Sequence, residues 1–326
     1  MRQQDVDIAE RQLAAGEHLR VTHRLGERHA VERAADLRDR RTGAGDDTRL
    51  VHARSLRKRT SCASLAPVET LQIRRLSQAG FVLSAGATTL VIDAFLSPRA
   101  DRLVLPKVTP LELAGASAIL ATHEHRDHLD PESLPALAMA SPAAPVVVPA
   151  PIVDLAAAGV DRRRIVPAAV GDELVVGAAH IFAIPARHGV TVADAYTFGT
   201  ELSGGLHRYL GYVIDLGGVC LYHAGDTVRY DGMAETLREL GVEVALLPIN
   251  GRSAEREARG FVGNLDHIGA ADLAADAAIG TIVPMHHDTI AGNTGSVSEL
   301  RAYVAARHPG LHVVEIAPFA RIDWPA

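Results

Sequence analysis

The chain has 326 residues, of which 48% are hydrophobic, and its formal charge at pH 7 is -6. This length is enough for one large domain or two smaller ones with a buried core. No apolar run approaches the roughly 18 residues that a membrane helix needs, and the N-terminus lacks the apolar core of a secretory signal. Having only two cysteines argues against a disulfide framework, and we expect a cytoplasmic protein.

Charge and composition divide the chain near residue 67. Residues 1–65 contain 14 Lys or Arg and 10 Asp or Glu, a balance of +4, whereas residues 66–326 have a balance of -10. The first part has few aliphatic residues with which to form a core, and its acidic residues argue against a transit peptide. We therefore expect residues 1–67 to be a disordered or non-native extension, and residues 68–326 to form the folded domain.

From about residue 68, short apolar runs rich in β-branched residues alternate with turns and helical stretches. Strands are predicted at residues 71–76, 79–85, 88–95, 117–122, 145–149, 173–177, 180–186, 210–216, 219–225, 243–248, 281–286 and 312–316. Helices are predicted at residues 131–140, 232–241, 266–280 and 296–308. Consecutive strands followed by strand–helix alternation, twice over, predict two sheets packed face to face with helices outside.

The segment HEHRDH, residues 123–128, directly follows the predicted strand that ends at Thr122, where α/β proteins place their chemistry. His123 and His125 are two residues apart, so their side chains point the same way on extended backbone. Asp127 and His128 follow as the loop turns and can face a second point nearby. Imidazole and carboxylate groups are ligands for Zn²⁺, Mn²⁺ or iron. One loop cannot complete two metal sites, so further ligands must come from elsewhere.

Three further candidates stand at the carboxyl ends of other predicted strands. They are His188, Asp226 and His286, each beside glycine or another polar residue. Because strand ends of this kind can meet at one edge of a fold, these side chains can reach the HEHRDH segment. The repeated placement predicts metal binding.

The order HxHxDH, then His, then Asp in Gly-Asp-Thr, then His resembles the signature of the metallo-β-lactamase superfamily over about residues 70–318. The resemblance implies an α/β fold, a four-layer αββα sandwich, for the hydrolase domain at residues 68–326. It also implies two divalent metal ions per chain, Zn²⁺ or Mn²⁺, at one edge of the two sheets. It implies that His123, His125 and His188 bind the first ion, that Asp127, His128 and His286 bind the second, and that Asp226 bridges them.

Two bridged ions would hold a water, lower its pKa towards neutrality and supply hydroxide at pH 7. They would also polarise a carbonyl or phosphoryl oxygen and take up the charge that develops. Asp127 could act as the catalytic residue that passes the proton to the leaving group. The site therefore predicts hydrolysis of an ester-like or phosphoester bond.

Asp93 and His287 lie beside the predicted ligands in the sequence, and their roles stay open. Asp93 ends a predicted strand and could orient a ligand histidine or only cap a turn. His287 should point away from its neighbour His286 on a strand, but it could line the substrate pocket.

Residues 246–252, 263–274 and 283–296 resemble the L-ascorbate-6-phosphate lactonase branch, through Asn-Gly-Arg, Gly-Asn before a helix, and PxHxD followed by Gly-Asn. The resemblance implies a lactonase, commonly manganese-dependent, acting on a small sugar-acid lactone, phosphorylated or not, or a related ester. The guanidinium of Arg252 suits a phosphate or carboxylate. Asn250 and Asn264 could bond substrate hydroxyls, although Asn-Gly is also an ordinary turn signal.

A phosphodiesterase of the same fold, acting on nucleic acid or phospholipid, is the alternative. A nuclease would carry a basic surface with stacking aromatics, whereas residues 66–326 are acidic and aromatic residues make up 4% of the chain. A lipid enzyme would need an apolar membrane face, which the sequence does not mark. A non-enzymatic scaffold would lack ligands, and none is missing. We therefore expect a small-molecule substrate and no nucleic-acid or membrane partner, and we leave a homo-oligomer open.

Overall fold

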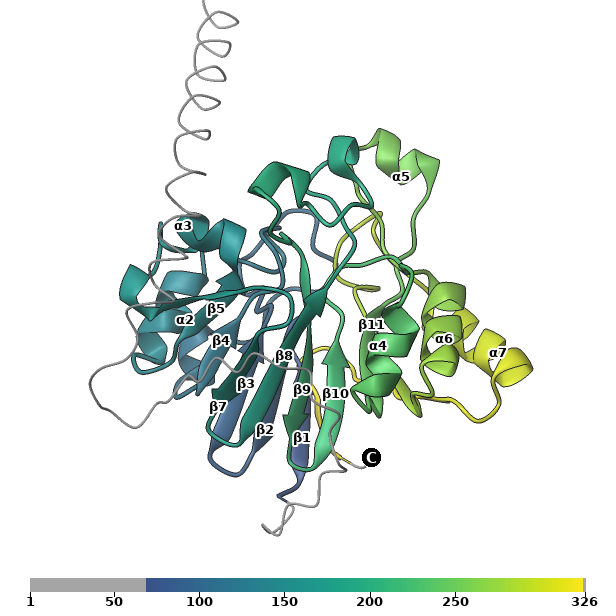
Figure 1. Cartoon of the computed structure of the whole chain (residues 1–326), viewed down its shortest axis with the longest axis horizontal. Helices are drawn as coiled ribbons and strands as arrows, with labels where there is room; N and C mark the ends of the chain where they lie inside the picture. The colour runs from purple at the N-terminus through teal and green to yellow at the C-terminus, as the bar shows by residue number, and fades with distance from the viewer. Residues whose placement is uncertain (1–68, 325–326) are drawn as a thin grey trace, which may run out of the picture.

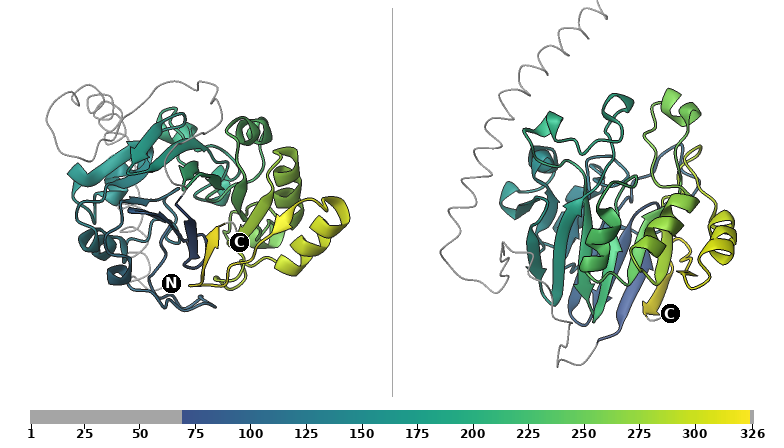
Figure 2. Two further views of the ribbon diagram at one scale, coloured as in Figure 1. Left: turned by 90° about the horizontal axis from the view of Figure 1, so that it is seen from below. Right: turned by 45° about the vertical axis from the view of Figure 1, so that its right-hand side comes forward.

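The computed structural model describes residues 69–324, so the predicted extension at residues 1–67 lies outside the described residues. Two seven-stranded sheets lie face to face in this part of the chain. Helices α2 (Leu134–Ala140) and α3 (Val153–Ala156) cover one sheet, and α4 (Met233–Glu239), α6 (His267–Asp276) and α7 (Val297–Arg307) cover the other (Figures 1 and 2). The predicted αββα sandwich is confirmed.

The first sheet joins an antiparallel half to a parallel half. In spatial order its strands are β14 (Arg321–Trp324), β1 (Leu71–Arg75), β2 (Phe81–Ala85), β3 (Thr88–Ile92), β4 (Ala118–Leu120), β5 (Val146–Pro149) and β6 (Ile165–Ala168). Strands β14 to β3 pair antiparallel, and β3 to β6 pair parallel. Strands β1 to β3, which are consecutive in the chain, therefore form an antiparallel meander.

The second sheet has the same mixed character. In spatial order its strands are β13 (His312–Val313), β12 (Thr281–Met285), β11 (Val244–Pro248), β10 (Val219–His223), β9 (Leu210–Leu216), β8 (Ala179–Pro185) and β7 (Glu173–Val176). Strands β10 to β13 are parallel, and β7 to β10 are antiparallel. Strands β8, β10, β11 and β12 therefore all end at the same edge of the sheet.

Strand β5 shows why the apolar runs lack polar alternation. Val147 belongs to the core between the two sheets, whereas Val146 and Val148 belong to the core under α2 and α3. Because successive strand residues point to opposite faces, a strand buried on both faces must be apolar throughout. The run Pro-Val-Val-Val-Pro is thus typical of the middle layers of a four-layer fold.

Some elements differ from those predicted. Strands β6 and β14 and the short helices α3 and α5 (Ala254–Ala258) were not expected, and the helix predicted from residue 131 begins at Leu134. Residues 131–133 form a turn and not the first turn of that helix. The carboxylate of Asp130 stabilises this turn by accepting hydrogen bonds from the backbone N–H and the hydroxyl of Ser133. Among the described residues, no helix is both long and apolar enough to cross a bilayer.

Candidate metal centre

The fold gathers all seven predicted metal ligands at one edge of the two sheets. The HEHRDH loop follows β4 of the first sheet, whereas His188, Asp226 and His286 follow β8, β10 and β12 of the second sheet. The ligand atoms form two groups, and within each group they all lie within 4.8 Å of one another. One group contains His123, His125, His188 and Asp226, and the other contains Asp127, His128 and His286.

The first group is built mainly from imidazole nitrogens. His125 Nδ1 lies 3.0 Å from His123 Nε2 and 3.2 Å from His188 Nε2. Asp226 Oδ2 lies 3.6 Å from His188 Nε2. Three nitrogens and one oxygen facing a common point form a donor set suited to zinc or a similar ion.

The second group has two imidazoles and a carboxylate, and Asp226 also faces it. His286 Nε2 lies 3.3 Å from Asp127 Oδ2 and 3.3 Å from Asp226 Oδ2. His128 Nε2 lies 3.3 Å from Asp226 Oδ1 and 3.9 Å from Asp127 Oδ2. Asp226 therefore lies between the two groups, as the predicted bridge requires.

Unpaired buried atoms and ligand spacing both fit bound cations. His128 Nε2 and Asp226 Oδ1 are buried and lie 3.3 Å apart without forming a well-aligned hydrogen bond, which is costly for polar atoms unless something else satisfies them. Two ligand atoms held about 2.0–2.1 Å from one tetrahedral ion lie roughly 3.3 Å apart. The observed separations of 3.0 to 3.9 Å bracket that value.

Asp93 organises two of the ligand histidines. Its Oδ2 lies 2.7 Å from His128 Nδ1 and accepts a 2.7 Å bond from the Thr122 hydroxyl, while Oδ1 accepts from the Thr122 N–H. The same hydroxyl lies 3.1 Å from His123 Nδ1. Holding Nδ1 in this way turns the Nε2 atoms towards the metal position. Of the two roles left open by the sequence, Asp93 therefore has the orienting one.

His125 is oriented from the opposite side. Its Nε2 donates to the carbonyl of Val190 at 3.1 Å, which leaves Nδ1 facing the metal position. The loop that carries Val190 is itself fixed, because Asp194 Oδ2 accepts from the Val190 N–H and from the hydroxyl of the buried Tyr209. The loop after β8 thus supports the first group of ligands.

The glutamate within HEHRDH does not face either group. Glu124 forms an ion pair with Arg208, and the two side chains are only 10% and 15% exposed. A bidentate pair of this kind restrains both backbones. Glu124 therefore anchors the ligand loop of the first sheet to the second sheet.

The pKa values of the first group favour neutral imidazoles. Burial lowers the pKa of His123 well below its ordinary value, and the neighbouring His128 and His125 add to the effect. Burial likewise lowers the pKa of His188 to about 3, although Asp226 opposes this. Both rings therefore offer a free lone pair at neutral pH, the form that binds metal.

The second group behaves differently because carboxylates surround it. Burial acts to lower the pKa of His286, but Asp226 and Asp127 outweigh it and raise the pKa to about 9. The same balance raises the pKa of His128 well above its ordinary value, chiefly through Asp226 and Asp93. Burial acts to raise the pKa of Asp226, but His286 and His128 hold it well below its usual range. Without a cation, these histidines therefore carry protons that balance the carboxylates.

Sequence reasoning missed Gln78, which also reaches the second group. It lies in the turn between β1 and β2 and is fully buried. Its Nε2 lies 2.9 Å from Asp127 Oδ2 and 3.0 Å from His286 Nε2. No sequence signal marked it, because a glutamine in a turn between strands is usually exposed.

Two of the predicted substrate residues, Asn250 and Asn264, join a buried chain of amides. Asn264 donates to Asn250 Oδ1 at 3.1 Å, and Asn250 donates to Asn293 Oδ1 at 2.8 Å. Asn264 Oδ1 has no partner. Asn250 follows β11 and Asn293 follows β12, and a direct role in substrate binding stays a prediction.

Arg252 and His287, the other two predicted substrate residues, lie in different surroundings. Arg252 is exposed, and its guanidinium lies 4.9 Å from the ring centre of Tyr196. Thr197, which follows Tyr196 in the chain, exchanges two backbone hydrogen bonds of 2.9 Å with His188. His287 is buried, its Nε2 has no partner, and burial followed by Arg75 lowers its pKa to about 4.

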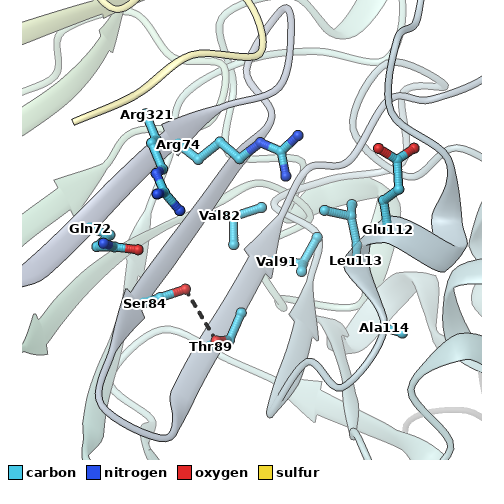
Figure 3. A pocket seen from close by; sticks show the side chains of 10 residues that line it. All are labelled: Gln72, Arg74, Val82, Ser84, Thr89, Val91, Glu112, Leu113, Ala114 and Arg321. Atoms are coloured by element: carbon cyan, nitrogen blue, oxygen red, sulfur yellow. Dashed lines mark hydrogen bonds between the residues drawn. The ribbon is translucent and has the colours of Figure 1, made fainter. Parts of the chain in front are cut away.

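Two of the pockets that lie outside the ligand groups are lined by more than one arginine. One, of about 480 Å³, is lined by Asn250, Arg252, Arg256 and Arg259 beside the N-termini of α6 and α7. The other, of about 190 Å³, lies on the outer face of β1 to β3, where Arg74 extends over Val82 and Ser84 bonds Thr89 at 3.1 Å (Figure 3). Neither is lined by any of the seven ligands.

Comparison with known proteins decides the family. The family model described as "Beta-lactamase superfamily domain" matches residues 88–287, more than half of the chain. The chain belongs to the metallo-β-lactamase superfamily. The superfamily resemblance seen in the sequence is thereby confirmed, whereas the lactonase branch stays a prediction.

Proteins similar to this chain agree with this assignment. A UPF0173 metal-dependent hydrolase of Aeropyrum pernix is 30% identical over 70% of this chain and 87% of its own length. One from Thermus thermophilus is 28% identical over 67% of this chain and 84% of its own. The metallo hydrolase Igni18 of Ignicoccus hospitalis shares the fold with a TM-score of 0.61 and 20% identity, covering 79% of this chain and 99% of that one. The chain is a metal-dependent hydrolase of this superfamily.

Proposed function

We propose that this hydrolase uses two divalent ions, Zn²⁺ or Mn²⁺, to open a small sugar-acid lactone or a related ester. The observation that carries the proposal is the place of Asp226. Its carboxylate oxygens face His188 on one side and His128 and His286 on the other, at 3.3 to 3.6 Å. A carboxylate shared in this way is suited to bridging two ions.

When bound, the two ions would lower the pKa of a water between them and polarise the scissile carbonyl. Asp127 is the residue best placed to move the proton. Its side chain is 19% exposed, whereas that of Asp226 is 5% exposed, so Asp127 can reach a substrate atom. Burial acts to raise the pKa of Asp127, but His128 and His286 hold it well below its usual range. Asp127 is thus ionised and can accept a proton.

The substrate class rests on Arg252 and on the lactonase-like motifs. Arg252 is exposed and packs on Tyr196, whose neighbour Thr197 is paired with the ligand His188. A guanidinium held on Tyr196, beside the backbone pairing of Thr197 with His188, can hold a phosphate or carboxylate remote from the scissile bond. We therefore favour a small anionic lactone over a long polyanion, for which the acidic body of the protein is unsuited.

Metal analysis followed by a substrate screen tests the proposal. Elemental analysis of the metal-loaded protein should give two ions per chain, and Asp226→Ala should lower that number and abolish turnover. A screen of sugar-acid lactones, phosphorylated and unphosphorylated, against phosphodiesters should show hydrolysis of lactones. A single ion that loading cannot increase would overturn the dinuclear centre, and activity confined to phosphodiesters would overturn the substrate class.

A further inference from the structure

The backbone of Gln78 is held in an unusual conformation beside the second ligand group. Its φ is 54°, in the left-handed region that non-glycine residues rarely adopt. Its N–H donates to Thr289 Oγ1 at 2.8 Å, and its carbonyl accepts from the N–H of His286 at 3.0 Å. His286 has a left-handed φ of 56° as well. The two residues therefore constrain each other, and strain of this kind collects at functional sites.

The carboxamide of Gln78 is buried but only half satisfied. Its Nε2 contacts Asp127 Oδ2 at 2.9 Å and His286 Nε2 at 3.0 Å, while Oε1 has no partner. A buried amide oxygen without a partner is costly. A hydrophobic side chain of similar length would fill the same space without that cost, so packing alone does not explain a glutamine here.

The spacing matches a shared position around one ion. Ligand atoms about 2.1 Å from a six-coordinate ion lie roughly 3.0 Å from their neighbours on that ion. The terminal atom of Gln78 has this separation from both Asp127 Oδ2 and His286 Nε2. A half-turn of the carboxamide about its last bond exchanges the two terminal atoms. The oxygen, which has lone pairs to offer, would then face the cation, and the amide nitrogen would leave it.

We propose that Gln78 is a fifth protein ligand of the second ion, through its carboxamide oxygen, beside Asp127, His128, His286 and Asp226. The proposal rests on the dinuclear centre of the proposed function. A ligand at Gln78 would make the two metal positions chemically different. The first position has three imidazoles and one carboxylate. The second would gain a neutral oxygen and a higher coordination number. Harder, six-coordinate ions such as Mn²⁺ prefer oxygen-rich sites, and zinc prefers four ligands. Gln78 therefore selects Mn²⁺ at the second position.

Gln78→Met tests this proposal, because it keeps the length of the side chain and removes the amide. Metal-free protein would be titrated with Mn²⁺ by calorimetry, with bound Mn²⁺ followed by electron paramagnetic resonance. We expect the second Mn²⁺ to bind at least about tenfold more weakly in the variant, with the first ion unchanged. Gln72→Met is the matched control, because it removes the same amide from a contact with Asp323 on the surface at 2.8 Å. Equal melting temperatures in chelator would show that both variants fold.

A crystal structure of the Mn²⁺-loaded protein distinguishes a ligand from a hydrogen-bond donor. We expect Gln78 Oε1 to lie within about 2.5 Å of the second ion. An amide nitrogen that still donates to Asp127, or wild-type Mn²⁺ affinity in Gln78→Met, would overturn the role of Gln78. If wild-type protein itself binds a single ion, the dinuclear centre fails instead, so the two failures are distinguishable.

Discussion

The carboxylate of Asp93 lies 2.7 Å from Nδ1 of His128, and both side chains are fully buried. Asp93 directly follows β3 with a left-handed φ of 47°, and its carboxylate also accepts hydrogen bonds from the N–H and the hydroxyl of Thr122, just before the ligand loop. The contact fixes the ring of His128 so that Nε2 faces the second metal position. A histidine held by a buried carboxylate is also a more basic ligand.

Asp93→Asn should weaken binding of the second ion. The amide keeps the size of the side chain but removes the charge that supports His128, and such changes cost about ten- to a hundredfold in metal affinity. Calorimetric titration with Mn²⁺ measures the effect. Asp323→Asn, an aspartate on the edge strand β14, serves as the control. Unchanged affinity in Asp93→Asn would mean that Asp93 only shapes the turn.

The two ions should differ in how their affinities depend on pH. His286 has a pKa of about 9 without metal, so an ion must displace its proton at neutral pH. Affinity at the second position should therefore rise as pH increases from 6 to 9 and then level off. The pKa of His188 is about 3, so that ring is already neutral over this range and the first position should change little. Calorimetric titrations in buffers of different ionisation enthalpy count the protons released on metal binding. An equal pH dependence of affinity at both positions would contradict the assignment of His188 to the first ion and His286 to the second.

Arg252→Ala should discriminate between anionic and neutral lactones. A bidentate contact with an anionic group contributes about 1.5–3 kcal/mol, so its loss should lower kcat/KM about ten- to a hundredfold for a phosphorylated lactone. A small neutral lactone should be affected little, and Arg252→Lys should recover part of the loss. Arg259→Ala, which alters the same pocket beside Phe261, is the matched control. If the ratio of the two kcat/KM values does not move in Arg252→Ala, the anionic substrate is wrong.

The partly buried ion pair between Arg75 and Asp288 should contribute to stability. Arg75 is fully buried and donates to both carboxylate oxygens of Asp288, at 2.9 and 2.6 Å, while Asp288 is 26% exposed. Asp288→Asn would leave the guanidinium without its counter-charge. We expect the free energy of unfolding to fall by about 2–3 kcal/mol, less than for a fully buried pair. Urea denaturation measures the free energy of unfolding, and Asp231→Asn, at an exposed aspartate, is the control. A change below about 0.5 kcal/mol in Asp288→Asn would contradict the prediction.

The candidate metal ligands could be located from the sequence because each follows an apolar strand. His188, Asp226 and His286 are far apart in the chain, yet one rule, that strand ends share an edge, brings them together. This rule does not find Gln78, because Gln78 lies in a turn and not at the end of a strand. Its place beside the site depends on a hydrogen bond to His286, more than two hundred residues away in the chain. Asp93 was noticed, but only the fold shows which histidine it orients.

Edge strands and short helices were harder to predict for a related reason. Strand β14 reads Arg-Ile-Asp-Trp, with exposed residues at every second position, and it forms because β1 offers a free edge with Gln72 opposite Asp323. Helix α5 has five residues and no buried side chain, so no apolar pattern marks it. These elements depend on long-range pairing or on capping by Ser253, which local composition does not display.

The division of ligands between the two sheets gives the ions a mechanical role. The first sheet supplies His123 and Asp127 through the loop after β4, and the second supplies His188 and His286. Each ion would therefore act as a cross-link that closes one end of the sandwich. By mass action, a ligand present at a hundredfold excess over its Kd stabilises a fold by about 2.7 kcal/mol. Metal supply in the cell would thus set how often this end opens to proteases.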